Sequence, residues 1–147
     1  MNKSEHLDTS TSSQINEALE LYAEEIQQTF SFVEIATEVK DDVRSRDYFK
    51  IAFAHLQKAA KIILKLSDEY PSHANIWTLM SKVVKAYDNQ LSNTFEWFQF
   101  TGNPAFDITI PSHRSKNRQY IKKNRTLASR TNKLELQAEK LIRAHLE

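Results

Sequence analysis

Apolar residues recur at steps of three and four along three long segments of the chain, which is the spacing of one face of an α-helix. The stripes are Ile15, Leu19, Tyr22, Ile26, Phe30 and Val33; Phe49, Ala52, Phe53, Leu56, Ala59, Ile63 and Leu66; and Ile76, Met80, Val83, Tyr87, Leu91, Thr94 and Phe98. A fourth helix is predicted from Ser112 to about Leu146. The pattern therefore predicts four long helices.

Polar residues and proline mark the expected ends of these helices. The charged stretch 40–47 has little apolar pattern and predicts a turn or kink, with Ser45 or Asp47 as the N-cap of the second helix. Tyr70–Pro71 predicts the end of that helix, because proline disfavours α geometry in the residue before it. Ser72 is then the expected cap of the third helix.

Gly102 occupies the position expected just beyond the third helix, where a C′ glycine commonly stands. Residues 101–111 are the one clear non-helical stretch. The polar segment 1–12 is expected to be a disordered tail, leaving 13–147 as a single helical domain. We predict an all-α fold, an up-and-down bundle of four or five helices.

Three other arrangements fit the same pattern. The first two helices could form one bent rod, the fold could be an intertwined dimer, or the second and third helices could be a helical-repeat pair. For that pair, Ala59, Pro71 and Trp77 have the spacing of a tetratricopeptide repeat, which the segment resembles over about 34 residues. The glycine and tyrosine positions of that motif hold Ser81 and Val84, and the resemblance implies no functional residues.

Composition excludes several kinds of chemistry. The single glycine leaves no phosphate-cradling loop or dinucleotide fingerprint, and the lack of cysteine leaves no disulfide, thiolate metal site or thiol nucleophile. No run approaches the roughly 20 apolar residues that span a bilayer, and residues 1–13 lack the apolar core of a signal peptide. We expect a cytoplasmic protein with no membrane contact.

The histidines give no metal-ligand spacing, and no nucleophile–base pair stands out. His55 lies between apolar positions and is expected to be a half-buried structural residue. A nuclease site built from His113, Arg114, Arg118 and Asn124 conflicts with helical spacing, which does not place His113 on one wall with Asn124. We therefore assign no catalytic, metal or cofactor-binding residues and expect no enzyme activity and no cofactor.

Charge is distributed very unevenly along the chain. Residues 1–42 carry ten acidic and two basic side chains, whereas residues 111–133 carry eight basic side chains and no acidic one. The basic side chains either pair with the acidic first helix of the same or a neighbouring chain, or contact nucleic-acid phosphates. The candidate contacts for an acidic partner or nucleic acid are Arg114, Arg118, Lys122 and Arg125.

Leucines in the fourth helix follow a strict spacing of seven, which predicts a heptad seam. Its candidate dimer residues are Tyr120, Leu127, Leu134 and Leu141, with Asn124, Thr131, Ala138 and His145 in the second row. The run KKNRTLASR looks superficially like a leucine-zipper basic region, but Asn132 stands where that pattern has a basic residue. A seam of this kind can face another copy or the other helices of the same chain.

Aromatic residues cluster at the end of the third helix and in the loop that follows. Trp97, Phe100 and Phe106 are candidate contacts for a partner, because aromatic side chains beside a loop often anchor one. The alternative is that the loop folds back and buries Phe100 and Phe106.

These observations favour a small, non-enzymatic protein-interaction or regulatory module that forms a homodimer. The alternative is a nucleic-acid-binding protein that uses the basic segment 112–133. A dimer built on the seam would weaken when Leu127 or Leu134 is replaced by Lys.

Overall fold

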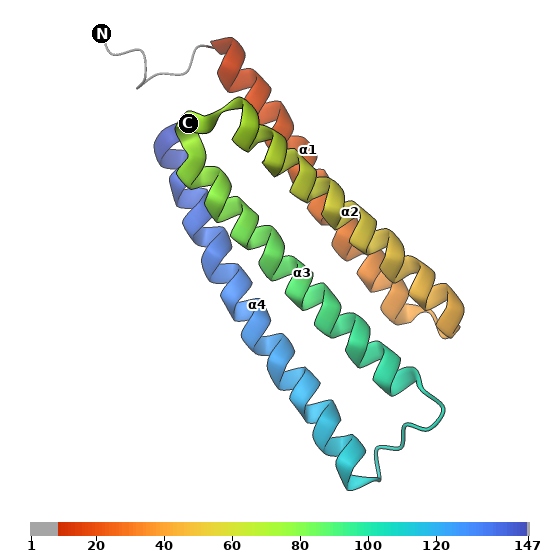
Figure 1. The fold of residues 1–147 in the computed structure, drawn as a ribbon. Helices are drawn as coiled ribbons and strands as arrows, with labels where there is room; N and C mark the ends of the chain where they lie inside the picture. Colours follow the sequence, from red (N-terminus) through yellow and green to blue (C-terminus); the bar gives the residue numbers. More distant parts are fainter. Residues whose placement is uncertain (1–8, 147) are drawn as a thin grey trace.

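A computed structural model of the protein describes residues 9–146, which form an antiparallel helical bundle (Figure 1). The helices are α1 (Thr9–Glu38), α2 (Asp42–Glu69), α3 (Ala74–Gly102) and α4 (Pro111–Leu146), with a 3₁₀ turn, η2 (Pro71–His73), between α2 and α3. The chain runs up and down along neighbouring helices, and the described residues contain no strand. The predicted all-α, up-and-down bundle is confirmed.

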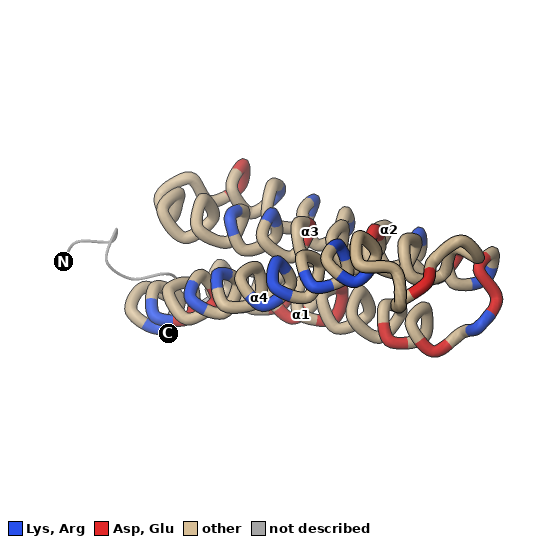
Figure 2. The backbone as a smooth tube through the Cα atoms, turned by 90° about the horizontal axis from the view of Figure 1, so that it is seen from below, with Lys and Arg blue, Asp and Glu red and all other residues tan. Residues whose placement is uncertain are grey.

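The bundle consists of two helical hairpins. α1 packs most extensively on α2, α3 packs on α4, and contacts between α2 and α3 join the hairpins. In the view turned by 90° from Figure 1, α2 and α3 form one layer of the bundle and α1 and α4 form the other (Figure 2). Because α1 turns back along α2, the two are not one bent rod.

The core is built from the apolar stripes predicted from the sequence. Fully buried side chains on each of the first three helices include Ile15, Phe49 and Trp77. Phe49 meets Phe95 edge to face, with 5.2 Å between ring centroids. The indole of Trp77 donates a hydrogen bond of 2.9 Å to the carbonyl of Tyr70, which ties α3 to the end of α2.

The turn between α1 and α2 differs in detail from the prediction. Asp41 is the N-cap of α2, and its carboxylate accepts a hydrogen bond from the backbone N–H of Val43. Ser45 and Asp47 therefore lie inside the helix, and neither caps it. The Ser45 hydroxyl instead donates to the carbonyl of Ala36, which holds α2 against the last turn of α1. The helix begins earlier than predicted because the first available capping carboxylate satisfies its free N–H groups.

The predicted caps of α3 are also wrong. Ser72 lies within the 3₁₀ turn, and His73 precedes α3 without a capping side-chain bond. Gly102 is the last helical residue rather than the C′ residue, and no described residue has a positive φ. Asn103 leaves the helix in an extended conformation, so the turn needs no left-handed glycine.

The helical region starts four residues before the predicted boundary at Ser13. Residues 9–12, expected to belong to the tail, form the first turn of α1. Residues 1–8 of the expected disordered tail lie outside the described residues.

Candidate functional site

The basic segment predicted from the sequence forms the first two thirds of α4, and its cations remain free of carboxylates. Arg114, Arg118, Lys122 and Arg125 are all exposed and follow one side of the helix. In the described chain, none of the eight cations of 111–133 lies within 4.0 Å of an acidic oxygen. We call Arg114, Arg118, Lys122 and Arg125 the basic stripe. It is a positively charged surface with no neutralising carboxylate among residues 9–146.

The acidic side chains of α1 are likewise exposed. Glu20, Glu24, Glu34 and Glu38 lie on its outer side and make no ion pair with another described residue. Figure 2 shows the acidic residues of α1 and the basic residues of α4 within the same layer of the bundle. Pairing between them inside one chain, one of the interpretations of the charge pattern, is not found among residues 9–146. Pairing between chains stays a prediction.

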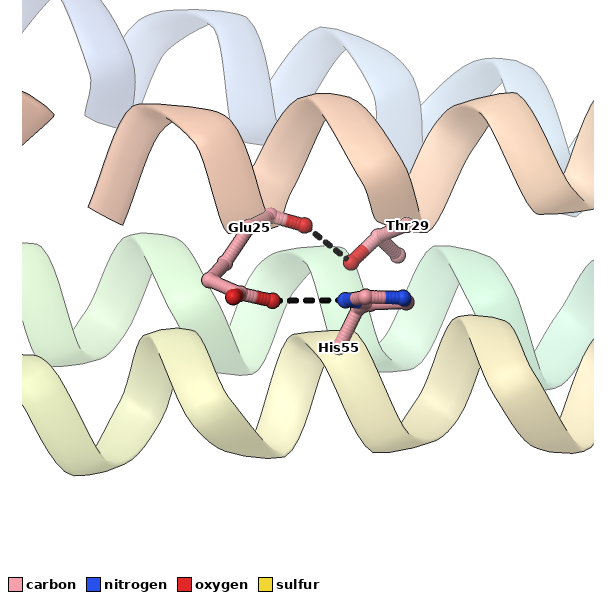
Figure 3. Close-up of polar contacts among 3 residues, drawn as sticks. All are labelled: Glu25, Thr29 and His55. Carbon is pink, nitrogen blue, oxygen red and sulfur yellow. Dashed lines mark hydrogen bonds and ion pairs between the residues drawn. The ribbon is translucent and has the colours of Figure 1, made fainter. Parts of the chain in front are cut away.

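One carboxylate of α1 does have a partner within the bundle. Glu25 turns toward α2, where its carboxylate lies 2.6 Å from Nδ1 of His55 (Figure 3). The imidazole stacks on the ring of Phe32, and both members of the pair are half-buried. Thr29 is fully buried beside them and donates its hydroxyl to the carbonyl of Glu25. His55 is therefore a half-buried residue joining α1 to α2, as the sequence predicted.

The heptad seam of α4 faces its own bundle. Tyr120, Leu127, Leu134 and Leu141 are half-buried, and the last two pack against the core. In the second row, Thr131 and Ala138 are buried, whereas His145 is exposed. The Thr131 hydroxyl donates to the carbonyl of Leu127 within α4, so burial leaves it satisfied. The periodicity of the seam is explained by packing within the chain, mainly on α3.

The aromatic cluster closes the end of the α3–α4 hairpin. Phe100 packs edge to face on Phe106, at 5.2 Å between centroids, and Phe106 stacks on His113 at the start of α4. Lys116 places its ammonium 4.7 Å from the centre of the Phe100 ring. Both phenylalanines are half-buried in this arrangement, so the loop folds back over α4 as one of the two alternatives proposed.

Trp97, the third candidate of that group, is held by α4. Its indole N–H donates a 2.6 Å hydrogen bond to the side-chain oxygen of Asn117, and its ring meets Phe98 edge to face. It is half-buried and does not join the Phe100 cluster. Trp97, Phe100 and Phe106 thus all pack against other residues of the α3–α4 hairpin.

An open pocket of about 250 Å³ lies between α1, α3 and α4, and no sequence pattern predicted it. Its floor is apolar and comes from α3. Its residues are Tyr22, Ala23, Ile26, Met80, Val83, Tyr87, Glu135, Ala138, Glu139 and Ile142. This α1–α4 groove exists because α1 and α4 contact each other much less than the other neighbouring helices do.

Titratable groups in the α1–α4 groove respond to its low polarity. Burial raises the pKa of Tyr22 above its usual range, and the nearby Glu135 raises it further. Burial also raises the pKa of Glu135, with added repulsion from Glu139 one turn later. Burial therefore makes the Glu135 carboxylate costly to charge. Tyr22 of α1 and Glu135 of α4 line the same groove.

No other chemistry is indicated within residues 9–146. They contain no cluster of three or more residues able to hold a metal ion. None of their helices combines the length and apolar character needed to cross a bilayer. Comparisons with protein-family models, curated proteins and solved structures find no match to this chain.

Proposed function

We propose that this protein is a non-enzymatic interaction module that binds an acidic protein surface through the basic stripe of α4. The observation that supports this function is the lack of any carboxylate partner for eight cations on one helix of the described chain. Exposed like charges repel one another, so an arrangement of this density gains from a bound anionic surface.

The surroundings of the basic stripe favour a protein over nucleic acid. The exposed carboxylates of α1 lie in the same layer as α4 and would repel a long phosphate backbone (Figure 2). The chain as a whole carries a formal charge of only +1. A protein partner can present acidic residues to α4 and other residues to α1, whereas a nucleic acid presents phosphates everywhere.

Binding of a fluorescent helical peptide rich in glutamate tests the proposal. The variant Arg118→Glu/Lys122→Glu/Arg125→Glu should weaken binding by at least about tenfold at low salt, because attraction becomes repulsion. A matched control, Lys50→Glu/Lys58→Glu/Lys61→Glu, makes the same change in net charge on exposed positions of α2 and should change the affinity by less than about twofold.

Two results would overturn the proposal. Equal loss in both variants would mean that only net charge matters. The second is a mixed-sequence duplex oligonucleotide that binds more tightly than the peptide and loses this binding between about 50 and 200 mM salt. That result would mean that the stripe binds nucleic acid.

A further inference from the structure

We infer that the acidic surface recognised by the basic stripe is α1 of a second copy of this chain, in a symmetric dimer. This inference rests on the proposed function, since it names the partner of the same surface. It uses three features of the structure: matched heights of opposite charges, the symmetry of the α1–α4 layer, and an exposed leucine on the face involved.

The opposite charges of α1 and α4 lie at matching heights along the bundle. Tyr22 and Glu135 line one pocket and interact electrostatically, so they share a height. The helices are antiparallel and rise equally per residue, so Glu24 shares a height with Lys133, and Glu34 lies level with the residue after Lys122. By the same count, Glu38 lies level with the residue after Arg118. Glu24, Glu34 and Glu38 therefore each have a cation at the same height or within one residue of it.

These pairs do not form within one chain, because the α1–α4 groove separates the two helices. Their long side chains point outward, away from the core-facing residues of each helix. Matching heights without contact is the arrangement needed for pairing across an interface. Each such pair is exposed and contributes little alone, so a row of them is required.

A two-fold axis parallel to the bundle brings the rows together. Such an axis keeps every residue at its height and exchanges the positions of the two outer helices. The α1–α4 layer of one copy then faces the same layer of the other, with α1 over α4 twice. This contact is isologous and closed, so it stops at two copies.

Leu136 supplies an apolar contact on the same side of α4, three residues beyond Lys133 at one end of the row of charges. It is 57% exposed on α4 and lies eighteen residues after Arg118, which is five helical turns and therefore the same side of the helix. On α1, the exposed Ala23 and the 36% exposed Phe30 border the groove side. Exposed apolar residues beside a row of charges give this surface both kinds of contact that protein interfaces use.

A charge-exchange experiment tests the dimer. One variant carries Glu24→Lys/Glu34→Lys/Glu38→Lys on α1, and the other carries Arg118→Glu/Lys122→Glu/Arg125→Glu on α4. Each alone places like charges at both contacts of the symmetric dimer and should sediment as a monomer. Mixed in equal amounts, they place opposite charges at both contacts and should form a mixed dimer. Circular dichroism checks that each variant keeps its helices.

The wild-type chain should sediment as a dimer at about 100 μM in low salt and weaken at least about tenfold in 0.5 M salt. The Leu136→Ala variant should dimerise less tightly. A mixture of the α1 variant with the Lys50→Glu/Lys58→Glu/Lys61→Glu control should form fewer mixed dimers than the exchange pair. A wild-type monomer, or an exchange pair that stays monomeric, overturns the dimer.

The outcomes separate this inference from the proposed function. One outcome is that the wild type is a monomer and binds the acidic peptide, whereas the α4 variant does not bind the peptide. The stripe then binds a different protein, and only the proposal of a second copy as its partner fails. If the peptide does not bind and yet the exchange pair dimerises, the stripe is specific for α1. If neither occurs, both proposals fail.

Discussion

The side-chain amide of Asn93 on α3 donates a hydrogen bond to the backbone carbonyl of Tyr120 on α4, with 3.2 Å between nitrogen and oxygen. Asn93 is only 2% exposed, and within the described chain its other amide atom, Oδ1, has no hydrogen-bond partner. A buried asparagine between two helices fixes their relative register at the expense of stability. Here it aligns the α3–α4 hairpin, and with it the height of the basic stripe.

Replacing Asn93 with Leu should raise the free energy of unfolding by about 1 kcal/mol, because it removes a buried acceptor that lacks a partner and keeps the number and branching of side-chain heavy atoms. Urea denaturation followed by circular dichroism measures the change. Asn93→Ala is the matched control and should be destabilising, since it leaves a cavity. A leucine variant less stable than the wild type would show that Oδ1 is satisfied in solution.

Gly102 ends α3 next to the start of α2, and a Cβ at this position would lie 3.0 Å from the carboxylate of Asp42. Asp42 is exposed and can move its side chain by the few tenths of an ångström required. Gly102→Ala should therefore stabilise the protein by about 0.5–1 kcal/mol through helix propensity. Thermal unfolding measures it, and a clear loss of stability would mean that the two helix ends cannot adjust.

Glu135 makes the stability of the protein depend on pH. Its pKa is raised in the folded state, so the folded chain binds more protons than the unfolded chain. Stability should consequently fall as pH rises through the interval above the ordinary value of 4.5. Glu135→Gln should remove this fall and, near neutral pH, stabilise the chain by about 0.2–0.5 kcal/mol, the scale of a like-charge pair one turn apart.

Urea titrations at several pH values test the Glu135 prediction. Glu20→Gln changes the same charge on the outer side of α1 and serves as the control. Parallel pH profiles for wild type and Glu135→Gln would contradict the assignment.

Leu134 and Leu136 lie two residues apart on α4 but in different environments. Leu134 packs against the core, whereas Leu136 is 57% exposed. Leu134→Ala should lower the free energy of unfolding by about 2 kcal/mol, and Leu136→Ala should change it by less than about 0.5 kcal/mol. Chemical denaturation at low protein concentration, where a dimer does not contribute, compares them. Equal effects would mean that α4 is rotated relative to this structure.

Helix positions were the most predictable part of the fold. The stripes containing Phe49, Leu56 and Ile63 are buried as predicted, because a core-facing helix must repeat apolar residues at its own period. Tyr70–Pro71 ends α2 as predicted, since the proline restriction is local. The caps at Ser45 and Ser72 were wrong because several polar residues compete for each helix start, and tertiary contacts choose among them.

The candidate site was less predictable, for a physical reason. Spacing shows that Leu127 and Leu134 share a side of a helix, but it does not show whether that side meets α3 or another chain. Charge counts show that α1 and α4 are complementary, but not that a groove keeps them apart. The burial of Asn93 and its hydrogen bond to α4 could not be predicted from the sequence. A polar residue among apolar positions does not show which group it will contact.

The division into two hairpins also bears on how the chain reaches this structure. The connection from α1 to α2 is residues 39–41 and that from α3 to α4 is residues 103–110, and most helix contacts fall within these two pairs. Contacts between residues near in sequence require little loop closure, and helical proteins of this kind fold in microseconds to milliseconds. Each hairpin can therefore assemble early, and the packing of α2 on α3 is then the step that joins the two hairpins.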